Sequence, residues 1–148
     1  MGARGEVCRG VGSQGCPRLT CLYLHGNQLT SVPAEVGQLA SLVELNLGSN
    51  KLKSLPAEIG QLTSLRVLHL DGNRLMSVPA DIGQLTSLRQ LSLRGNKLTS
   101  LPAEIGQLTS LRELYLRRNK LTSVPAAIRE LRAAGGIVQL DDGVSFDE

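Results

Sequence analysis

The chain has 148 residues, enough for one domain, and its formal net charge of +3 comes from 16 basic and 13 acidic residues. These charges are mixed along the chain, which excludes the concentrated basic block of a typical nucleic-acid-binding protein. Aromatic residues make up only 2 % and tryptophan is absent, so the core cannot be centred on aromatic side chains. No apolar run approaches the ~18 residues of a membrane-spanning helix.

The N-terminal segment, residues 1–15, is rich in glycine and poor in apolar side chains, so we expect it to be disordered. It lacks the hydrophobic stretch of a secretory signal. The chain has three cysteines, all before the first repeat described below ends, and this odd number indicates no disulfide framework. We therefore expect a reducing, cytoplasmic setting.

A 23-residue period fills residues 16–134 and predicts a stack of repeated units. The five repeats start at Leu19, Leu42, Leu65, Leu88 and Leu111. Each unit follows the pattern LxxLxLxxNxLxxLPxxIGxLxx, with valine in some leucine and isoleucine slots. In an extended LxxLxL segment, the leucines two apart point to one face and the residues between them to the other. One such strand cannot bury its leucines alone, so we expect stacked strands in a parallel sheet over a shared core.

The rest of each unit predicts a return path on the opposite side of the core. One asparagine follows each strand, and stacked asparagines could form a structural ladder that satisfies buried turn amides. The members of this ladder are Asn27, Asn50, Asn73, Asn96 and Asn119. A proline then begins a short helical or 3₁₀ turn, with an acidic residue near its positive end. We expect that turn to end at a glycine in the left-handed conformation. The glycines concerned are Gly37, Gly60, Gly83 and Gly106.

This unit resembles the leucine-rich repeat of the 23-residue typical class. It is most similar to the intracellular Ras-group-related leucine-rich repeat proteins, whose repeats also read LPxxIGxLxxL. The resemblance covers residues 19 to about 134 and implies an α/β fold, a right-handed horseshoe solenoid with its parallel sheet on the concave face and short helical or 3₁₀ turns on the convex face. It also implies a scaffold that binds a partner protein on the concave face, in small-GTPase or kinase signalling as in its relatives. It implies no catalytic residues.

The fifth repeat departs from the others and predicts a C-terminal cap. Arg129 stands where the other repeats have glycine, and three apolar residues around it recur at helical spacing. We therefore expect an amphipathic helix over residues 126–134 that ends at Gly135.

The last segment, residues 135–148, predicts a cap strand followed by an acidic tail. Val138 and Leu140 are two residues apart, as in the strands of the repeats. A terminal repeat must shield the open end of the core, which explains why this one is atypical. The N-terminal end shows no comparable cap, which suggests a fragment of a longer protein or a capping partner.

Binding specificity is expected where the repeats differ, at the outward strand positions and the residues just after them. These predicted partner-binding residues are Tyr23, His25, Glu44, Asn46, Val67, His69, Asp71, Gln90, Ser92, Arg94, Glu113, Tyr115, Arg117 and Arg118. Tyrosine and arginine are frequent interface anchors. Arginines in the C-terminal half, together with those that follow the first leucine of each repeat, predict a basic patch for an acidic or polar protein segment. The arginines of this patch are Arg66, Arg89, Arg94, Arg112, Arg117 and Arg118. Alternatively, Arg66, Arg89 and Arg112 are ordinary solvated surface.

Three cysteines and one histidine near the N-terminus have the residue types of a structural zinc site. Cys8, Cys16, Cys21 and His25 have the spacing C-x7-C-x4-C-x3-H, which resembles CCCH zinc fingers. In an extended strand, however, the Cα atoms of Cys21 and His25 would lie roughly 13 Å apart, too far to share one ion. No metal or other cofactor is therefore expected.

Catalysis is not expected either. His69 and Asp71 share one face, but no nucleophile in a closed pocket accompanies them. We expect a protein partner, and neither a nucleic acid nor a membrane. The alternative to a free scaffold is a recognition fragment of a larger multidomain receptor-type or immune-type protein.

Overall fold

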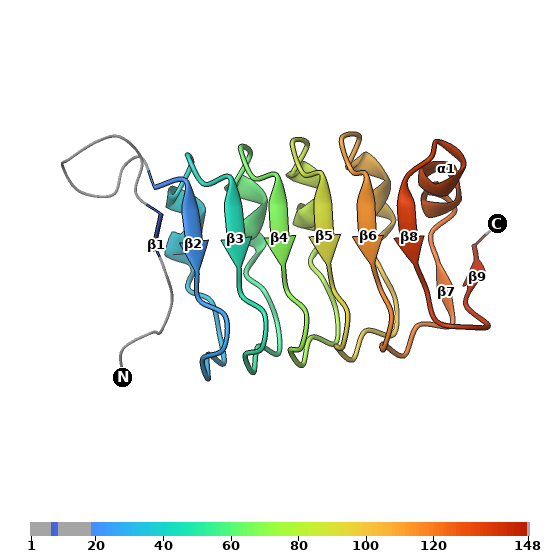
Figure 1. The fold of residues 1–148 in the computed structure, drawn as a ribbon, viewed down its shortest axis with the longest axis horizontal. Helices are drawn as coiled ribbons and strands as arrows, with labels where there is room; N and C mark the ends of the chain where they lie inside the picture. The colour runs from blue at the N-terminus through green and yellow to red at the C-terminus, as the bar shows by residue number, and fades with distance from the viewer. Residues whose placement is uncertain (1–6, 9–18, 148) are drawn as a thin grey trace.

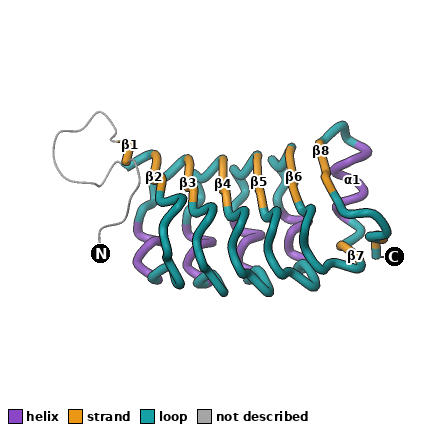
Figure 2. The backbone as a smooth tube through the Cα atoms, turned by 60° about the horizontal axis from the view of Figure 1, so that its bottom comes forward, coloured by secondary structure: helices purple, strands orange, loops and turns teal. Residues whose placement is uncertain are grey.

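The computed structural model describes residues 7–8 and 19–147, and within them the repeats stack side by side as one solenoid (Figure 1). The strands line one face, and short 3₁₀ helices line the opposite face (Figure 2). This arrangement confirms the predicted repeat solenoid with a parallel sheet.

Across the described residues, the main sheet has seven strands in the order β1-β2-β3-β4-β5-β6-β8. The parallel strands are β2 (Cys21–Tyr23), β3 (Glu44–Asn46), β4 (Val67–His69), β5 (Gln90–Ser92), β6 (Glu113–Tyr115) and β8 (Ile137–Gln139). Their register sets the central residue of each strand beside its equivalent in the next, as Leu45 beside Leu68. Repeated residues therefore form straight columns across the sheet.

Strand β1 (Val7–Cys8) pairs antiparallel with β2 and places Cys8 opposite Cys21 in the backbone register. The repeat pattern did not predict this strand. The remainder of the expected disordered segment, residues 1–15, lies outside the described residues, as does Cys16.

The core consists of leucine columns. Each leucine is fully buried only where its repeat lies between two other repeats or between a repeat and the C-terminal cap. Leu45 is fully buried and Leu47 is 1 % exposed. Their equivalents in the first repeat, Leu22 and Leu24, are only partly buried. Fully burying a leucine side chain contributes about 1.5–3 kcal/mol, so most of the stabilisation comes from the stacking of repeats.

The convex side carries one five-residue 3₁₀ helix in each of the first four repeats. These helices are η1 (Ala34–Gln38), η2 (Ala57–Gln61), η3 (Ala80–Gln84) and η4 (Ala103–Gln107). A proline precedes each helix, and its carbonyl accepts the first helical hydrogen bond, as from Ile59 N to Pro56 O at 3.1 Å. Glu58 in the first turn lies near the positive end of its helix, as predicted.

The predicted role of the repeat glycines is wrong. Gly60 and its equivalents lie inside the 3₁₀ helices, which continue to the following glutamine, and none of these glycines has a positive φ. Left-handed residues occur instead just after the strands, where Gly72 has a φ of +70° and Ser49 one of 54°. The helix needs glycine for space, because a Cβ at Gly60 would lie 2.5 Å from Asp81 O in the next repeat.

The asparagine column forms a hydrogen-bonded ladder between repeats. Asn73 Nδ2 donates to Leu47 O and to Leu70 O, both at 3.0 Å, and Asn73 Oδ1 accepts from Leu52 N at 3.1 Å. Asn50 and Asn96 make the same set of contacts with their own neighbours, and all three side chains are buried. The ladder therefore ties each repeat to the one before it.

The predicted helix-and-strand cap closes the C-terminal end. Helix α1 (Ala127–Ala133) replaces the 3₁₀ helix of the fifth repeat, and Ile128 on it is buried. Past β8, the Asp141 carboxylate accepts hydrogen bonds from Arg118 N at 2.9 and 3.1 Å. In earlier repeats a backbone carbonyl accepts the equivalent bond, as Arg94 O does from Gly72 N. The Asp141 side chain thus replaces the carbonyl of a further repeat and ends this series of bonds between repeats.

The predicted acidic tail packs against the cap. Strand β9 (Ser145–Phe146) pairs in parallel with β7 (Ser123–Val124). The guanidinium groups of Arg129 and Arg132 lie 5.3 and 5.5 Å from the centre of the Phe146 ring, within the range of cation–π attraction. Helix and tail therefore hold each other in place.

Candidate functional site

The outward side chains of the strands form two columns, which together with the residues that follow each strand we call the concave face. One column runs Cys21, Glu44, Val67, Gln90 and Glu113, and the other runs Tyr23, Asn46, His69, Ser92 and Tyr115. The structure thus brings the predicted strand residues together on one surface. Most are half-buried, whereas Ser92 is 8 % exposed and offers little surface.

Each tyrosine of the concave face is held by a carboxylate in the other column. Tyr115 Oη donates to Glu113 Oε1 at 2.6 Å, and Tyr23 hydrogen-bonds the Glu44 side chain. The bond to Glu113, together with burial, raises the pKa of Tyr115 above its ordinary value. The bond to Glu44 does the same for the pKa of Tyr23, with smaller contributions from burial and a bond to Cys21. The sequence pattern did not reveal these pairs, which fix the orientation of both rings.

We expect both tyrosines to stay protonated at the pH where an ordinary tyrosine, with a pKa of 10.0, is half ionised. The chain has two tyrosines and no tryptophan, so tyrosinate absorbance in an alkaline titration reports on this pair alone. Glu113→Gln should return the pKa of Tyr115 towards its ordinary value. Because folding raises both pKa values, their contribution to stability is complete below about pH 10 and is lost as the pH rises through the folded pKa values. An unshifted titration curve in the folded protein would contradict the pairing.

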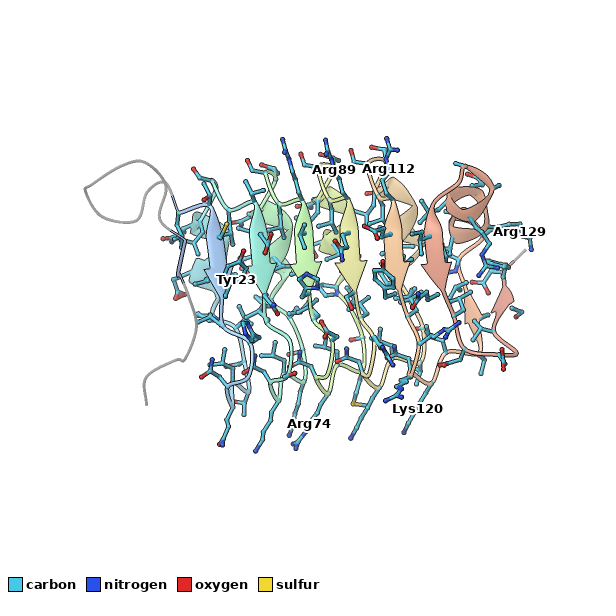
Figure 3. The ribbon with its side chains drawn as sticks, in the orientation of Figure 1. Tyr23, Arg74, Arg89, Arg112, Lys120 and Arg129 are labelled. Carbon is cyan, nitrogen blue, oxygen red and sulfur yellow. The ribbon has the colours of Figure 1, made fainter. Side chains whose placement is uncertain are left out.

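The predicted basic patch is divided into two rows at opposite ends of the strands. Arg89 and Arg112 precede β5 and β6, and they extend from one edge of the solenoid (Figure 3). Arg94 and Arg117 follow the same two strands and are exposed at the other end. The second row, with Arg118, lies at the opposite ends of the strands from the first row, so the arginines do not form one continuous patch.

His69 at the end of β4 and Asp71 just after it make one loose contact. The distance from His69 Nδ1 to Asp71 Oδ1 is 3.9 Å, and these two half-buried groups attract each other only when the histidine is protonated. His25, two residues after β2, is exposed. Within residues 7–8 and 19–147, no group of three histidine, cysteine, aspartate or glutamate side chains could hold a metal ion. Nor does any described helix combine the length and apolar character needed to span a bilayer.

Sequence reasoning missed the part of the concave face contributed by β8. Ile137 continues the column of Glu113, and Gln139 continues the column of Tyr115. Ile137 is 48 % exposed and, with Arg112 and Leu131, lines a groove between β6 and α1. The sequence carries a signal for this, because Val138 and Leu140 have the spacing of the inward leucines and their neighbours Ile137 and Gln139 therefore face outward.

Comparisons with known proteins agree with this architecture. A family model described as a leucine-rich repeat region matches residues 15–96, and a model of two leucine-rich repeat copies matches residues 86–131. No curated protein matches the chain in sequence.

Two solved structures show the same fold. A leucine-rich repeat protein of Leptospira interrogans is 43 % identical with a TM-score of 0.79, and the match covers 89 % of this chain but 33 % of that protein. The BIR2 ectodomain of Arabidopsis thaliana is 24 % identical with a TM-score of 0.68, over 86 % of this chain and 69 % of the ectodomain. The chain thus spans about a third of the Leptospira protein. The repeat pattern, the stacked architecture and the family match establish that the chain belongs to the leucine-rich repeat proteins, which are typically non-enzymatic scaffolds.

Proposed function

We propose that the chain is a protein-interaction scaffold that binds a partner protein on its concave face. The observation that supports this most is the contrast between fixed and variable columns. The inward leucines and the asparagine ladder repeat almost without change, whereas each outward column has a different residue at every step. A rigid sheet that presents such a row of side chains loses little conformational entropy on binding.

The partner that suits this surface is a polar or acidic protein segment. Tyr23 and Tyr115 stand on β2 and β6, four strand spacings or roughly 19 Å apart, and each is oriented by a carboxylate. The exposed Arg94 and Arg117 supply positive charge along the ends of β5 and β6. Two oriented aromatic anchors and a row of arginines match the composition of many interface hot spots.

We further propose a cytoplasmic role in signal transduction, with a partner from a small-GTPase or kinase pathway. This rests on the resemblance of the LPxxIGxLxxL repeats to the Ras-group-related class. A second candidate is a recognition part of a larger receptor-type or immune-type protein. The alignment with only 33 % of the Leptospira protein favours that alternative, since related repeats there belong to a longer chain.

Affinity capture of binding proteins, with the unaltered chain, a concave-face variant and a control variant, tests the proposal. Tyr23→Ala/His69→Ala/Tyr115→Ala should weaken binding of a captured partner about 30-fold or more, because loss of an interface anchor commonly costs about 2 kcal/mol. The control is Thr63→Ala/Thr86→Ala/Thr109→Ala, three exposed positions after the 3₁₀ helices, which should leave the affinity unchanged.

The same assay tests the charge preference of the concave face. Arg94→Glu/Arg117→Glu should select against acidic segments and leave neutral ones bound. If every captured protein binds the three-alanine concave variant as tightly as the unaltered chain, the concave face is not the binding surface.

A further inference from the structure

Half of the positive charge of the chain lies on one edge of the solenoid, in the loops that follow β3 to β6. We call residues 48–54, 71–77, 94–100 and 117–123 the basic rim. Its cations, eight of the 16 lysines and arginines in the chain, are Lys51, Lys53, Arg74, Arg94, Lys97, Arg117, Arg118 and Lys120. Asp71 is the only acidic residue in the four loops. Since the formal net charge of the whole chain is only +3, the rest of the molecule is net negative.

The basic rim presents these charges on a fixed framework. The backbone amides of Arg74, Lys97 and Lys120 each donate to a leucine carbonyl of the preceding repeat at 2.8 Å. The three side chains are exposed, and those of Arg74 and Lys120 extend away from the body of the solenoid (Figure 3). In the part of the chain that the structure describes, no rim cation forms an ion pair, the single pair being His69 with Asp71. Their charge is therefore available to an external anion.

An exposed apolar side chain lies within the same surface. Met76 is 64 % exposed and, with Ile137, is one of two exposed large hydrophobic residues among those described. It occupies the position held by Lys53 in the repeat before it and by Thr99 in the repeat after it. Met76 is thus surrounded by cationic and hydroxyl side chains rather than by an apolar patch.

We propose that the basic rim adsorbs to an anionic membrane surface, with Met76 entering the headgroup region. The four loops end along a common edge, so their side chains can reach one plane together (Figure 1). Lipid charges are laterally mobile and need no pocket, and clusters of four to eight lysines and arginines are sufficient to attract anionic bilayers. The rim has no aromatic residue on which nucleic-acid bases could stack, which disfavours a single-stranded nucleic acid.

This proposal revises the expectation that no membrane is involved. That expectation followed from the absence of a long apolar run, and adsorption through surface charge requires none. The rim shares Arg94, Arg117 and Arg118 with the concave face, whereas Arg74, Lys97, Lys120 and Met76 lie outside the outward strand columns. Variants at these last four residues therefore test the membrane proposal without changing the residues proposed for partner binding.

Co-sedimentation with lipid vesicles tests the proposal. The full chain should bind phosphatidylcholine vesicles that contain about a third phosphatidylserine, with an affinity that falls steeply as salt is added, and should not bind pure phosphatidylcholine. Arg74→Glu/Lys97→Glu/Lys120→Glu should reduce binding about 100-fold or more. Met76→Ser should reduce it a few-fold and leave its salt dependence unchanged.

The matched control is Arg66→Glu/Arg89→Glu/Arg112→Glu, which makes the same change in net charge at the opposite ends of the strands. This variant should retain most of the vesicle binding. If it loses as much as the rim variant, net charge rather than the rim is responsible and the proposal is overturned. Equal binding to neutral vesicles overturns it as well.

A glutamine variant and a competing nucleic acid complete the test. Arg74→Gln/Lys97→Gln/Lys120→Gln replaces the glutamate variant if thermal unfolding shows that the latter does not fold, and it too should lose most of the binding. A single-stranded oligonucleotide serves as the competing polyanion. If it binds the rim in a salt-dependent way while phosphatidylserine vesicles do not, the rim recognises nucleic acid and the membrane proposal fails.

Discussion

Asn73→Ala should lower the free energy of unfolding by roughly 3 kcal/mol, since a buried polar group left without a partner costs about 1–3 kcal/mol. Asn73 Oδ1 accepts the hydrogen bond from Leu52 N, and alanine would leave that buried amide without its acceptor. The bonds from Nδ2 to Leu47 O and Leu70 O would be lost as well. Those two carbonyls keep a second donor each, in Asn50 and Asn96, which limits the loss.

Urea unfolding monitored by circular dichroism measures this effect, and Asn46→Ala is the matched control. Asn46 lies on the concave face, is half-buried and accepts one bond from Gly48 N at 3.0 Å within its own repeat. Its replacement should cost about 1 kcal/mol or less. Equal losses for the two variants would show that the ladder contributes no more than an isolated surface bond.

Asn73→Asp tests the hydrogen bond that the side chain accepts separately from the two that it donates. Aspartate keeps an acceptor for Leu52 N but loses both donated bonds and sets a carboxylate against the Leu47 and Leu70 carbonyls. Because that charge would be buried and repelled, this variant should be at least as destabilised at neutral pH as Asn73→Ala. A markedly milder effect would mean that the accepted bond alone carries the stabilisation.

The repeat pattern predicted the fold because each element recurs with the same residues in the same order. Leucines two residues apart define a strand with one buried face, and their recurrence every 23 residues requires stacking, so the sheet and the core follow together. The cap was predictable for the opposite reason, because Arg129 breaks the pattern where every other repeat has glycine. The place of the concave columns followed from strand alternation alone.

The features that were missed depend on where individual side chains point and how far they reach, which the repeat pattern does not contain. The bond between Tyr115 and Glu113 joins neighbouring columns on one strand and becomes visible only when both side chains are placed. The arginines before and after each strand looked like one basic set because they are close in sequence. Four residues, the three of the strand and the leucine after it, separate them, so they emerge at opposite edges of the sheet.

The glycine of the 3₁₀ helix is where the prediction from the sequence and the structure differ most. A residue that ends a helix in the left-handed conformation is often glycine, and so is a residue where two backbones approach closely, but the reasons differ. In this protein Gly72 has the positive φ, whereas Gly60 lies in a right-handed helix against the next repeat. The two reasons predict opposite responses to asparagine, a residue that tolerates the left-handed conformation but adds a Cβ.

Gly60→Asn should therefore destabilise the protein by about 3 kcal/mol, while Gly72→Asn should change its stability by less than about 1 kcal/mol. A Cβ at Gly60 would lie 2.5 Å from Asp81 O, and relieving that contact requires η2 and η3 to move apart and open the core behind them. A Cβ at Gly72 meets nothing closer than 3.5 Å, and Ser49 and Arg118 already adopt a positive φ at the equivalent positions. Urea midpoints of the two variants measure the difference directly. Equal midpoints, or a larger loss at Gly72, would mean that the spacing of the convex helices does not set the requirement for glycine.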